Sequence, residues 1–139
     1  MAASPPVTRI AVNPPAIFTS LEHGFSQGVV AGGRRTLFVS GQTAWDAEKR
    51  LIGGADRAAQ AARAVANVRA VVEAAGATVA DVVMVRIYVV DYRPEHAAAV
   101  GGAFREAFAG VAPACCWIGV AALADPGFLI EVEAIAVFD

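Results

Sequence analysis

The chain has few charged residues: Asp, Glu, Lys and Arg make up 17% of its 139 residues, and the formal net charge is −2. Nucleic acids and anionic membranes attract proteins through an excess of Lys and Arg. That excess is missing, because 11 basic residues are set against 13 acidic ones. We therefore expect neither nucleic acid nor a membrane as a partner, and RNA cleavage is disfavoured.

Cysteine and histidine are also scarce. The only cysteines are the neighbours Cys115 and Cys116, and the only histidines are His23 and His96. Adjacent cysteines rarely bond to each other, because the ring would be strained. Neither histidine stands at zinc-ligand spacing from the cysteines. The sequence therefore predicts free thiols and no metal site.

Long apolar runs are missing as well. No stretch reaches the roughly 18 residues of a membrane span. Residues 1–6 have neither the charged start nor the apolar centre of a signal peptide. Free thiols behind such an N-terminus predict a cytoplasmic protein.

Apolar residues, by contrast, are in excess, at 57% of the chain. A length of 139 residues fits one domain, which we place over residues 1–139 with residues 1–6 as a frayed tail. A soluble domain hides surplus apolar surface most readily between subunits. We therefore expect an oligomer.

The spacing of apolar residues predicts an α+β domain. A helical period runs from Ala55 to Gly76, and a second helix opens at Pro94 and extends to about Phe108. Strands are expected at residues 7–12, 25–31, 36–40 and 82–90, with two more in the last quarter. The order is β-β-β-α-β-α-β-β, with both helices on one face of a mixed sheet.

The last expected strand carries two carboxylates within an apolar run. Side chains alternate faces along a strand, so Glu131 and Glu133 lie on the same face, about 6–7 Å apart. Such a pair is not a core feature. It must meet water, a cation or a substrate.

An ordered set of short motifs then identifies a family. The chain resembles the Rid superfamily, also called the YjgF/YER057c/UK114 group, and the matching pieces cover nearly its whole length. They are residues 24–28 (GFSQG), 38–42 (FVSGQ), Asn67, 73–77 (EAAGA), 81–83 (DVV), 88–91 (YVVD), 113–114 (PA) and 131–137 (EVEAIAV).

The resemblance implies a chorismate-mutase-like fold and a homotrimer with pockets between subunits. The best-known members of this family hydrolyse reactive enamines and imines to keto acids and ammonia, without a cofactor. In them an arginine directly after Pro-Ala holds the substrate carboxylate, and a glutamate near the C-terminus positions water. Glu131 matches that glutamate, so we expect it to be the catalytic residue.

The chain departs from the family pattern at the substrate carboxylate. Cys115 follows Pro113-Ala114 where the family has arginine, and a thiol cannot form the bidentate, charge-assisted pair of a guanidinium. Phe25 replaces a tyrosine, and Gly101 stands where asparagine is common. The resemblance therefore implies an atypical substrate.

Cys115 has two readings, as a thiolate nucleophile or as a small apolar filler. The second is favoured because no histidine lies near it in sequence and a nearby Glu131 would raise the pKa of the thiol. Cys116 faces the other way and is expected in the core. Trp117 shares the face of Cys115 and either lines the pocket or fills the subunit interface.

Three further residues complete the expected substrate-binding set. Phe25 lines the pocket, and Ser40 offers a hydrogen bond at a strand end. Arg86 interrupts an apolar strand and needs a partner. We favour an ion pair of Arg86 with Glu133 or with a neighbouring subunit. The other reading is that Arg86 supplies the pocket with a cation.

The sequence thus supports two hypotheses. The first is an imine or enamine deaminase, or a related enzyme of water addition or elimination, acting on an unsaturated amino or keto compound. The alternative is a non-catalytic protein that binds a metabolite or acts as a holdase. The missing arginine at position 115 favours the alternative.

Overall fold

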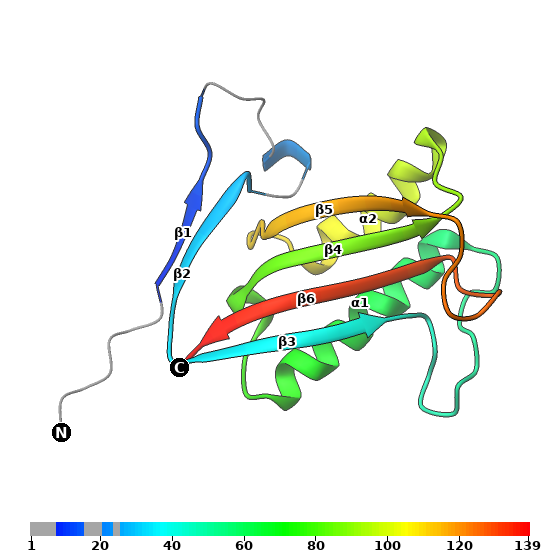
Figure 1. The fold of residues 1–139 in the computed structure, drawn as a ribbon, viewed down its shortest axis with the longest axis horizontal. Helices are drawn as coiled ribbons and strands as arrows, with labels where there is room; N and C mark the ends of the chain where they lie inside the picture. Colours follow the sequence, from blue (N-terminus) through cyan, green and yellow to red (C-terminus); the bar gives the residue numbers. More distant parts are fainter. Residues whose placement is uncertain (1–7, 16–20, 24–25) are drawn as a thin grey trace.

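A computed structural model describes residues 8–15, 21–23 and 26–139 (Figure 1). Its elements follow the predicted order β-β-β-α-β-α-β-β, with three short 3₁₀ turns between them. The strands are β1 (Thr8–Val12), β2 (Gly28–Gly32), β3 (Arg35–Gln42), β4 (Val82–Val90), β5 (Ala114–Val120) and β6 (Ile130–Phe138). The helices are α1 (Arg57–Ala74) and α2 (Ala97–Ala107), and the 3₁₀ turns are Leu21–His23, Val79–Asp81 and Pro94–His96. The expected tail at residues 1–6 and the pocket residue Phe25 lie outside the described residues.

The strands form a two-stranded hairpin, β1-β2, and a four-stranded sheet in the order β3-β6-β4-β5. β4 and β5 are parallel, whereas the β3-β6 and β4-β6 pairs are antiparallel, so the sheet is mixed as predicted. Both helices lie behind the same face of this sheet (Figure 1). The α+β prediction is therefore confirmed.

Strand alternation divides β6 between the two faces of the sheet. Its residues are buried and half-buried in turn from Ile130 to Phe138. The buried ones join Val85 and Ile87 of β4 in a core closed by the helices. The face away from the helices is open in the single chain, and we call it the open face.

Helix α1 begins and ends at local signals that the sequence contains. The Asp56 side chain caps its first turn by accepting a hydrogen bond from the Ala59 backbone N–H at 3.1 Å. Gly76, with φ of +85°, follows its end in a left-handed conformation that glycine adopts without strain. Within the described residues, neither helix is long and apolar enough to span a membrane.

Candidate functional site

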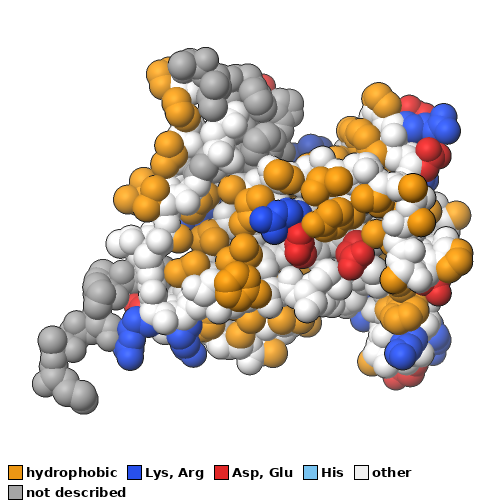
Figure 2. Space-filling model, in the orientation of Figure 1, with side chains coloured by type: hydrophobic (Ala, Val, Ile, Leu, Met, Phe, Trp, Pro, Cys, Tyr) orange, Lys and Arg blue, Asp and Glu red, His pale blue; other side chains and the backbone are white. Residues whose placement is uncertain are grey.

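The two neighbouring carboxylates of β6 lie on the open face, as predicted. Glu131 stands opposite Tyr88 of β4, and Glu133 stands opposite Arg86. All four side chains are half-buried. Figure 2 shows the setting, with acidic and basic groups over β4 and β6 among apolar side chains.

Glu133 is held by two donors from β4. The Arg86 Nη1 lies 3.3 Å from the Glu133 Oε1, and the Tyr88 hydroxyl donates to the same oxygen at 2.5 Å. The favoured reading of Arg86, an ion pair with Glu133, is therefore present in the structure. A role of Arg86 toward a substrate stays a prediction.

The contact with Glu133 also changes the acidity of Tyr88. Its pKa is raised, first by the hydrogen bond to Glu133, then by burial and by the charges of Glu133 and Glu131, while Arg86 opposes the shift. The phenol is therefore a neutral donor across the physiological pH range. It keeps Glu133 occupied.

Glu131 differs from Glu133 in having no partner of this kind. Its carboxylate accepts no hydrogen bond from the described part of the chain. It lies against Gly41 at the end of β3, where any Cβ would overlap it. Gly41 thus makes room for this carboxylate, and Ser40, the residue before Gly41, is exposed. Glu131, Gly41 and Ser40 form what we call the acid half-site.

Cys115 and Trp117 lie on the opposite face of the sheet from Glu131. They are in register with Val85 and Ile87 of β4, which are buried beneath the helices. Cys115 packs against that core. Within one chain the sheet therefore separates these two residues from the acid half-site.

Burial decides the chemistry of Cys115. It raises the pKa of this thiol to about 12, with a smaller contribution from Cys116 and an opposing hydrogen bond involving Trp117. At neutral pH the group is a neutral thiol, which is a weak nucleophile. The structure thus supports the favoured reading of Cys115 as an apolar filler.

Cys116 corrects one expectation. It does face away from Cys115, but it is exposed and not part of the core. It stands in register with Arg86 on the open face. The reason is that both helices lie on the other face of the sheet, so that nothing within the described chain covers Cys116.

Trp117 lies among small and aromatic neighbours on the helix side of β5. Its ring meets that of Tyr92 edge to face, with centroids 6.1 Å apart. The indole also lies over Gly101 of α2, where a Cβ would be 3.4 Å from Cη2. We call Cys115, Trp117, Tyr92 and Gly101 the aromatic half-site.

The segment before β2 is tied to the start of β5. Ser26 is buried, donates its hydroxyl to the Ala112 carbonyl at 2.6 Å, and forms a parallel bridge with Ala114. Ser26 is thus anchored one position before Cys115. The matched segment at residues 24–28 therefore has a structural role at this residue.

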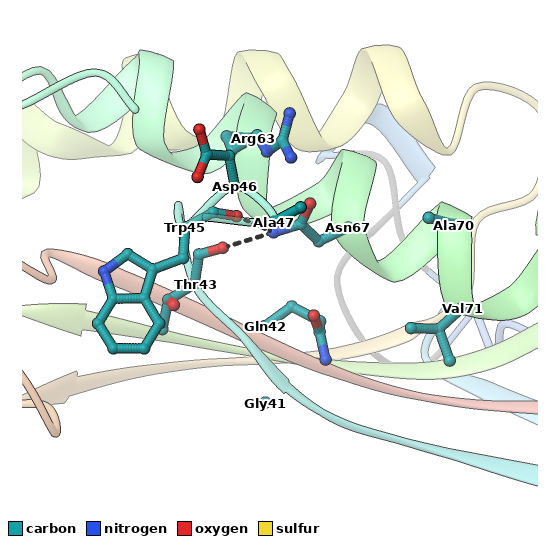
Figure 3. Close-up of a pocket in the computed structure, with 10 residues that line it drawn as sticks. All are labelled: Gly41, Gln42, Thr43, Trp45, Asp46, Ala47, Arg63, Asn67, Ala70 and Val71. Atoms are coloured by element: carbon teal, nitrogen blue, oxygen red, sulfur yellow. Dashed lines mark hydrogen bonds between the residues drawn. The ribbon is translucent and has the colours of Figure 1, made fainter. Parts of the chain in front are cut away.

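An open cleft of about 460 Å³ lies between α1 and the loop after β3, and Gly41 of the acid half-site is at its edge (Figure 3). Its walls include Trp45, Arg63 and Asn67. The Asn67 side chain donates to the carbonyls of Thr43 and Trp45, both at 2.9 Å, and so fixes the loop. None of the predicted site residues lines this cleft. Sequence reasoning placed Asn67 in the family pattern but missed this anchoring role.

Trp45, in the loop after β3, packs against other parts of the chain. Its ring packs edge to face on Phe128 with centroids 4.8 Å apart. The Lys49 ammonium lies 5.7 Å from its centroid on another side. Trp45 therefore contributes to packing of the loop.

Among residues 8–15, 21–23 and 26–139, no cluster of three or more His, Cys, Asp or Glu side chains could hold a metal.

The chain matches known proteins along most of its length. The family model described as Endoribonuclease L-PSP matches residues 18–138. A Rid-family protein of unknown function, YyfB from Yersinia pestis, is 43% identical with a TM-score of 0.90, over 94% of this chain and 98% of that one. A YjgF/YER057c/UK114 member from Mycobacterium tuberculosis is 32% identical with a TM-score of 0.63, over 94% and 99%. The YjgF gene product of E. coli is 34% identical with a TM-score of 0.64, over 81% and 87%. On these matches and its fold, the chain belongs to the Rid (YjgF/YER057c/UK114) family.

Proposed function

We propose that this protein is a hydrolase of the imine/enamine deaminase type, with Glu131 as the residue that handles water and protons. The observation that carries the proposal is the difference between the two carboxylates of β6. Glu133 is occupied by Arg86 and Tyr88, whereas Glu131 accepts no hydrogen bond within the described residues. A free, half-buried carboxylate is available to a substrate or to water.

Hydrolysis of an imine needs one group, here the Glu131 carboxylate, that can accept a proton and return it. Water adds to the carbon of the protonated C=N bond while Glu131 accepts a proton from it, giving a neutral carbinolamine. Glu131 then returns this proton to nitrogen, the C–N bond breaks, and ammonia leaves while Glu131 accepts the hydroxyl proton as the C=O bond forms. An enamine is first protonated on carbon to give the same protonated imine. General acid–base catalysis of this kind contributes about 10²–10⁴-fold to a rate.

The positions of the two half-sites support an oligomer with pockets between subunits, which we propose is a homotrimer. The acid half-site and the aromatic half-site occupy opposite faces of one sheet. A single pocket that contains both therefore needs two copies of the chain. The open face also carries Phe38 with 73% of its surface exposed, which supports burial against another copy.

The substrate is expected to be larger or flatter than a small 2-imino acid. Cys115 supplies no charge, because burial keeps its thiol neutral. Trp117 and Tyr92 offer an aromatic wall beside it. These features favour an unsaturated amino or keto compound with a planar part.

The test measures ammonia release while an amino-acid oxidase generates imines in the same solution. Glu131→Gln is expected to slow the release by about 10²-fold or more, because the amide cannot accept the proton. Glu133→Gln is the matched control, since it makes the same change on the same strand at an occupied carboxylate. A Glu131→Gln protein as fast as the wild type would remove Glu131 from the mechanism.

The alternative is a non-catalytic binding or holdase-like protein, and the neutral Cys115 favours it. It is supported if the protein leaves the rate of ammonia release unchanged for acyclic and cyclic imines alike.

The matching family description mentions an endoribonuclease. For this chain the net charge of −2 gives no electrostatic reason to bind RNA.

A further inference from the structure

A guanidinium and an indole ring converge over one glycine of α2. A Cβ at Gly101 would lie 3.1 Å from the Arg105 Nη1 and 3.4 Å from the Trp117 Cη2. Arg105 is one helical turn beyond Gly101 on the same face of the helix. The missing side chain at position 101 is thus what lets Arg105 and Trp117 approach each other.

The charge of Arg105 is available for a ligand. Arg50, Arg86 and Arg93 each form an ion pair with a carboxylate. Arg105 forms no ion pair or hydrogen bond with any residue that the structure describes. It is also exposed.

Arg105 has aromatic neighbours on the side of Trp117, and the His96 ring lies beyond them, 6.3 Å from that of Tyr92. The Tyr92 and Trp117 side chains are 39% and 36% exposed, and their rings meet edge to face. Gly119, two residues after Trp117 on β5, leaves room for Tyr92, because a Cβ there would lie 3.3 Å from the Tyr92 Cβ. A planar group can therefore lie against these rings, and a carboxylate on it can reach the guanidinium.

We propose that Arg105 is the anion-binding residue of the aromatic half-site, and that the ligand is a carboxylic acid with a planar aromatic or cyclic part. The cation comes from α2, because Cys115 of β5 supplies none. Gly101 is the positioning residue, since it keeps the space in which the guanidinium lies. This inference rests on the proposed function, whose substrate class it names.

The test compares three probes: phenylpyruvate, its neutral methyl ester and 2-oxobutanoate. Binding to the full-length protein is followed by calorimetry and by quenching of Trp117 in a Trp45→Phe background. We expect phenylpyruvate to bind more tightly than either of the other probes. Arg105→Gln should weaken phenylpyruvate binding by about 10–100-fold, the usual effect of losing a hydrogen bond to a charged group. The affinity of the ester should not change.

Gly101→Ala is a second variant that does not depend on removing the charge. Alanine is a better helix former than glycine, so a folding defect is not expected. Its Cβ displaces the flexible guanidinium, and phenylpyruvate binding should weaken while 2-oxobutanoate binding changes less. Arg50→Gln, in a loop and already paired with Asp46, is the control for a general loss of positive charge.

The outcomes separate this inference from the proposed function. Glu131→Gln should lose ammonia release and keep its affinity for phenylpyruvate. If Arg105→Gln binds phenylpyruvate as tightly as the wild type, or if the wild type binds acid and ester equally, Arg105 is not the anion site, whatever Glu131 does. If Glu131→Gln stays active while Arg105→Gln loses binding, the hydrolytic role fails and the anion site stands.

Discussion

Arg86 of β4 stands directly opposite Glu133 of β6, and its guanidinium lies 3.3 Å from the carboxylate. Their side chains are 39% and 32% exposed, so water screens the pair in a single chain. Pairs of this kind contribute about 0–1 kcal/mol to stability. The contact has a second effect, because it supplies the Glu133 carboxylate with a hydrogen-bond donor. Glu131 is the carboxylate of β6 that accepts no hydrogen bond from the described residues.

The acidity of Tyr88 provides the first prediction. Glu133→Gln should lower the pKa of Tyr88 toward its ordinary value of 10.0, because the charged hydrogen-bond acceptor is the main cause of the rise. Phenolate absorbance against pH measures this in a Tyr92→Phe background, where Tyr88 is the only tyrosine. Glu131→Gln, which removes only the weakest of the contributions, should shift the midpoint less. An unmoved midpoint in Glu133→Gln would contradict the contact.

The same shift has a consequence for stability. A raised pKa means that the folded state favours the protonated phenol. Its contribution is full below the ordinary pKa of 10.0 and is lost as the pH rises through the folded pKa. Wild-type protein should therefore lose more stability than Tyr88→Phe over that alkaline range, as measured by urea unfolding at each pH.

The two thiols should differ in reactivity. With a pKa raised to about 12, Cys115 is ionised to only about one part in 10⁴ at pH 8. Cys116→Ser, which leaves only Cys115, should react slowly with an aromatic disulfide reagent, and unfolding should speed the reaction. Cys115→Ser, which keeps the exposed Cys116, is the comparison. A fast reaction of Cys115 in the folded protein would show that its thiol is neither buried nor neutral.

A substitution at Phe38 tests whether the protein assembles as proposed. Its exposed ring lies on the open face, in register with Ile135 of β6. Phe38→Lys should shift the protein toward monomer in sedimentation velocity, because a charge replaces apolar contact area. Ile52→Lys changes a side chain that is 39% exposed in the loop before α1, and should keep the assembly. A wild-type protein that is monomeric at every concentration would refute the trimer.

Gln60 of α1 is a fully buried polar residue. Its amide donates to the carbonyls of Gly54 at 2.6 Å and Gly127 at 2.9 Å, and its oxygen accepts from the Leu129 N–H at 2.9 Å. Gln60→Leu leaves these backbone groups without their partner and should cost about 3 kcal/mol or more in the free energy of unfolding.

Urea unfolding at one fixed protomer concentration measures that cost, because the stability of an oligomer depends on concentration. Glu73→Leu, an exposed change on the same helix, should stay within about 0.5 kcal/mol of the wild type. Equal midpoints for Gln60→Leu and the wild type would mean that the three hydrogen bonds contribute nothing.

Much of the fold could be predicted because it depends on local periodicity. The alternation along β6 placed Glu131 and Glu133 on one face, and helical spacing predicted α1 between Ala55 and Gly76. The pairing of Arg86 with Glu133 was predictable because a charge in a half-buried strand needs a partner. These inferences use only the geometry of a strand or a helix.

The residues 115–117 show where such reasoning stops. Alternation correctly placed Cys115 and Trp117 on one face and Cys116 on the other, but it could not tell which face the helices cover. That depends on the register of β5 on β4, which sets Cys115 beside the buried Val85 and Cys116 beside Arg86. Cys116 was therefore expected in the core and is exposed.

The sequence by itself determined the family, the order of elements and the identity of the two carboxylates, because these follow from motif order and from side-chain period. The tertiary structure decided which carboxylate is free, and it brought Arg105 of α2 beside Trp117 of β5. The physical reason is that contacts between elements depend on strand register and helix packing. Neither has a local signature in the chain.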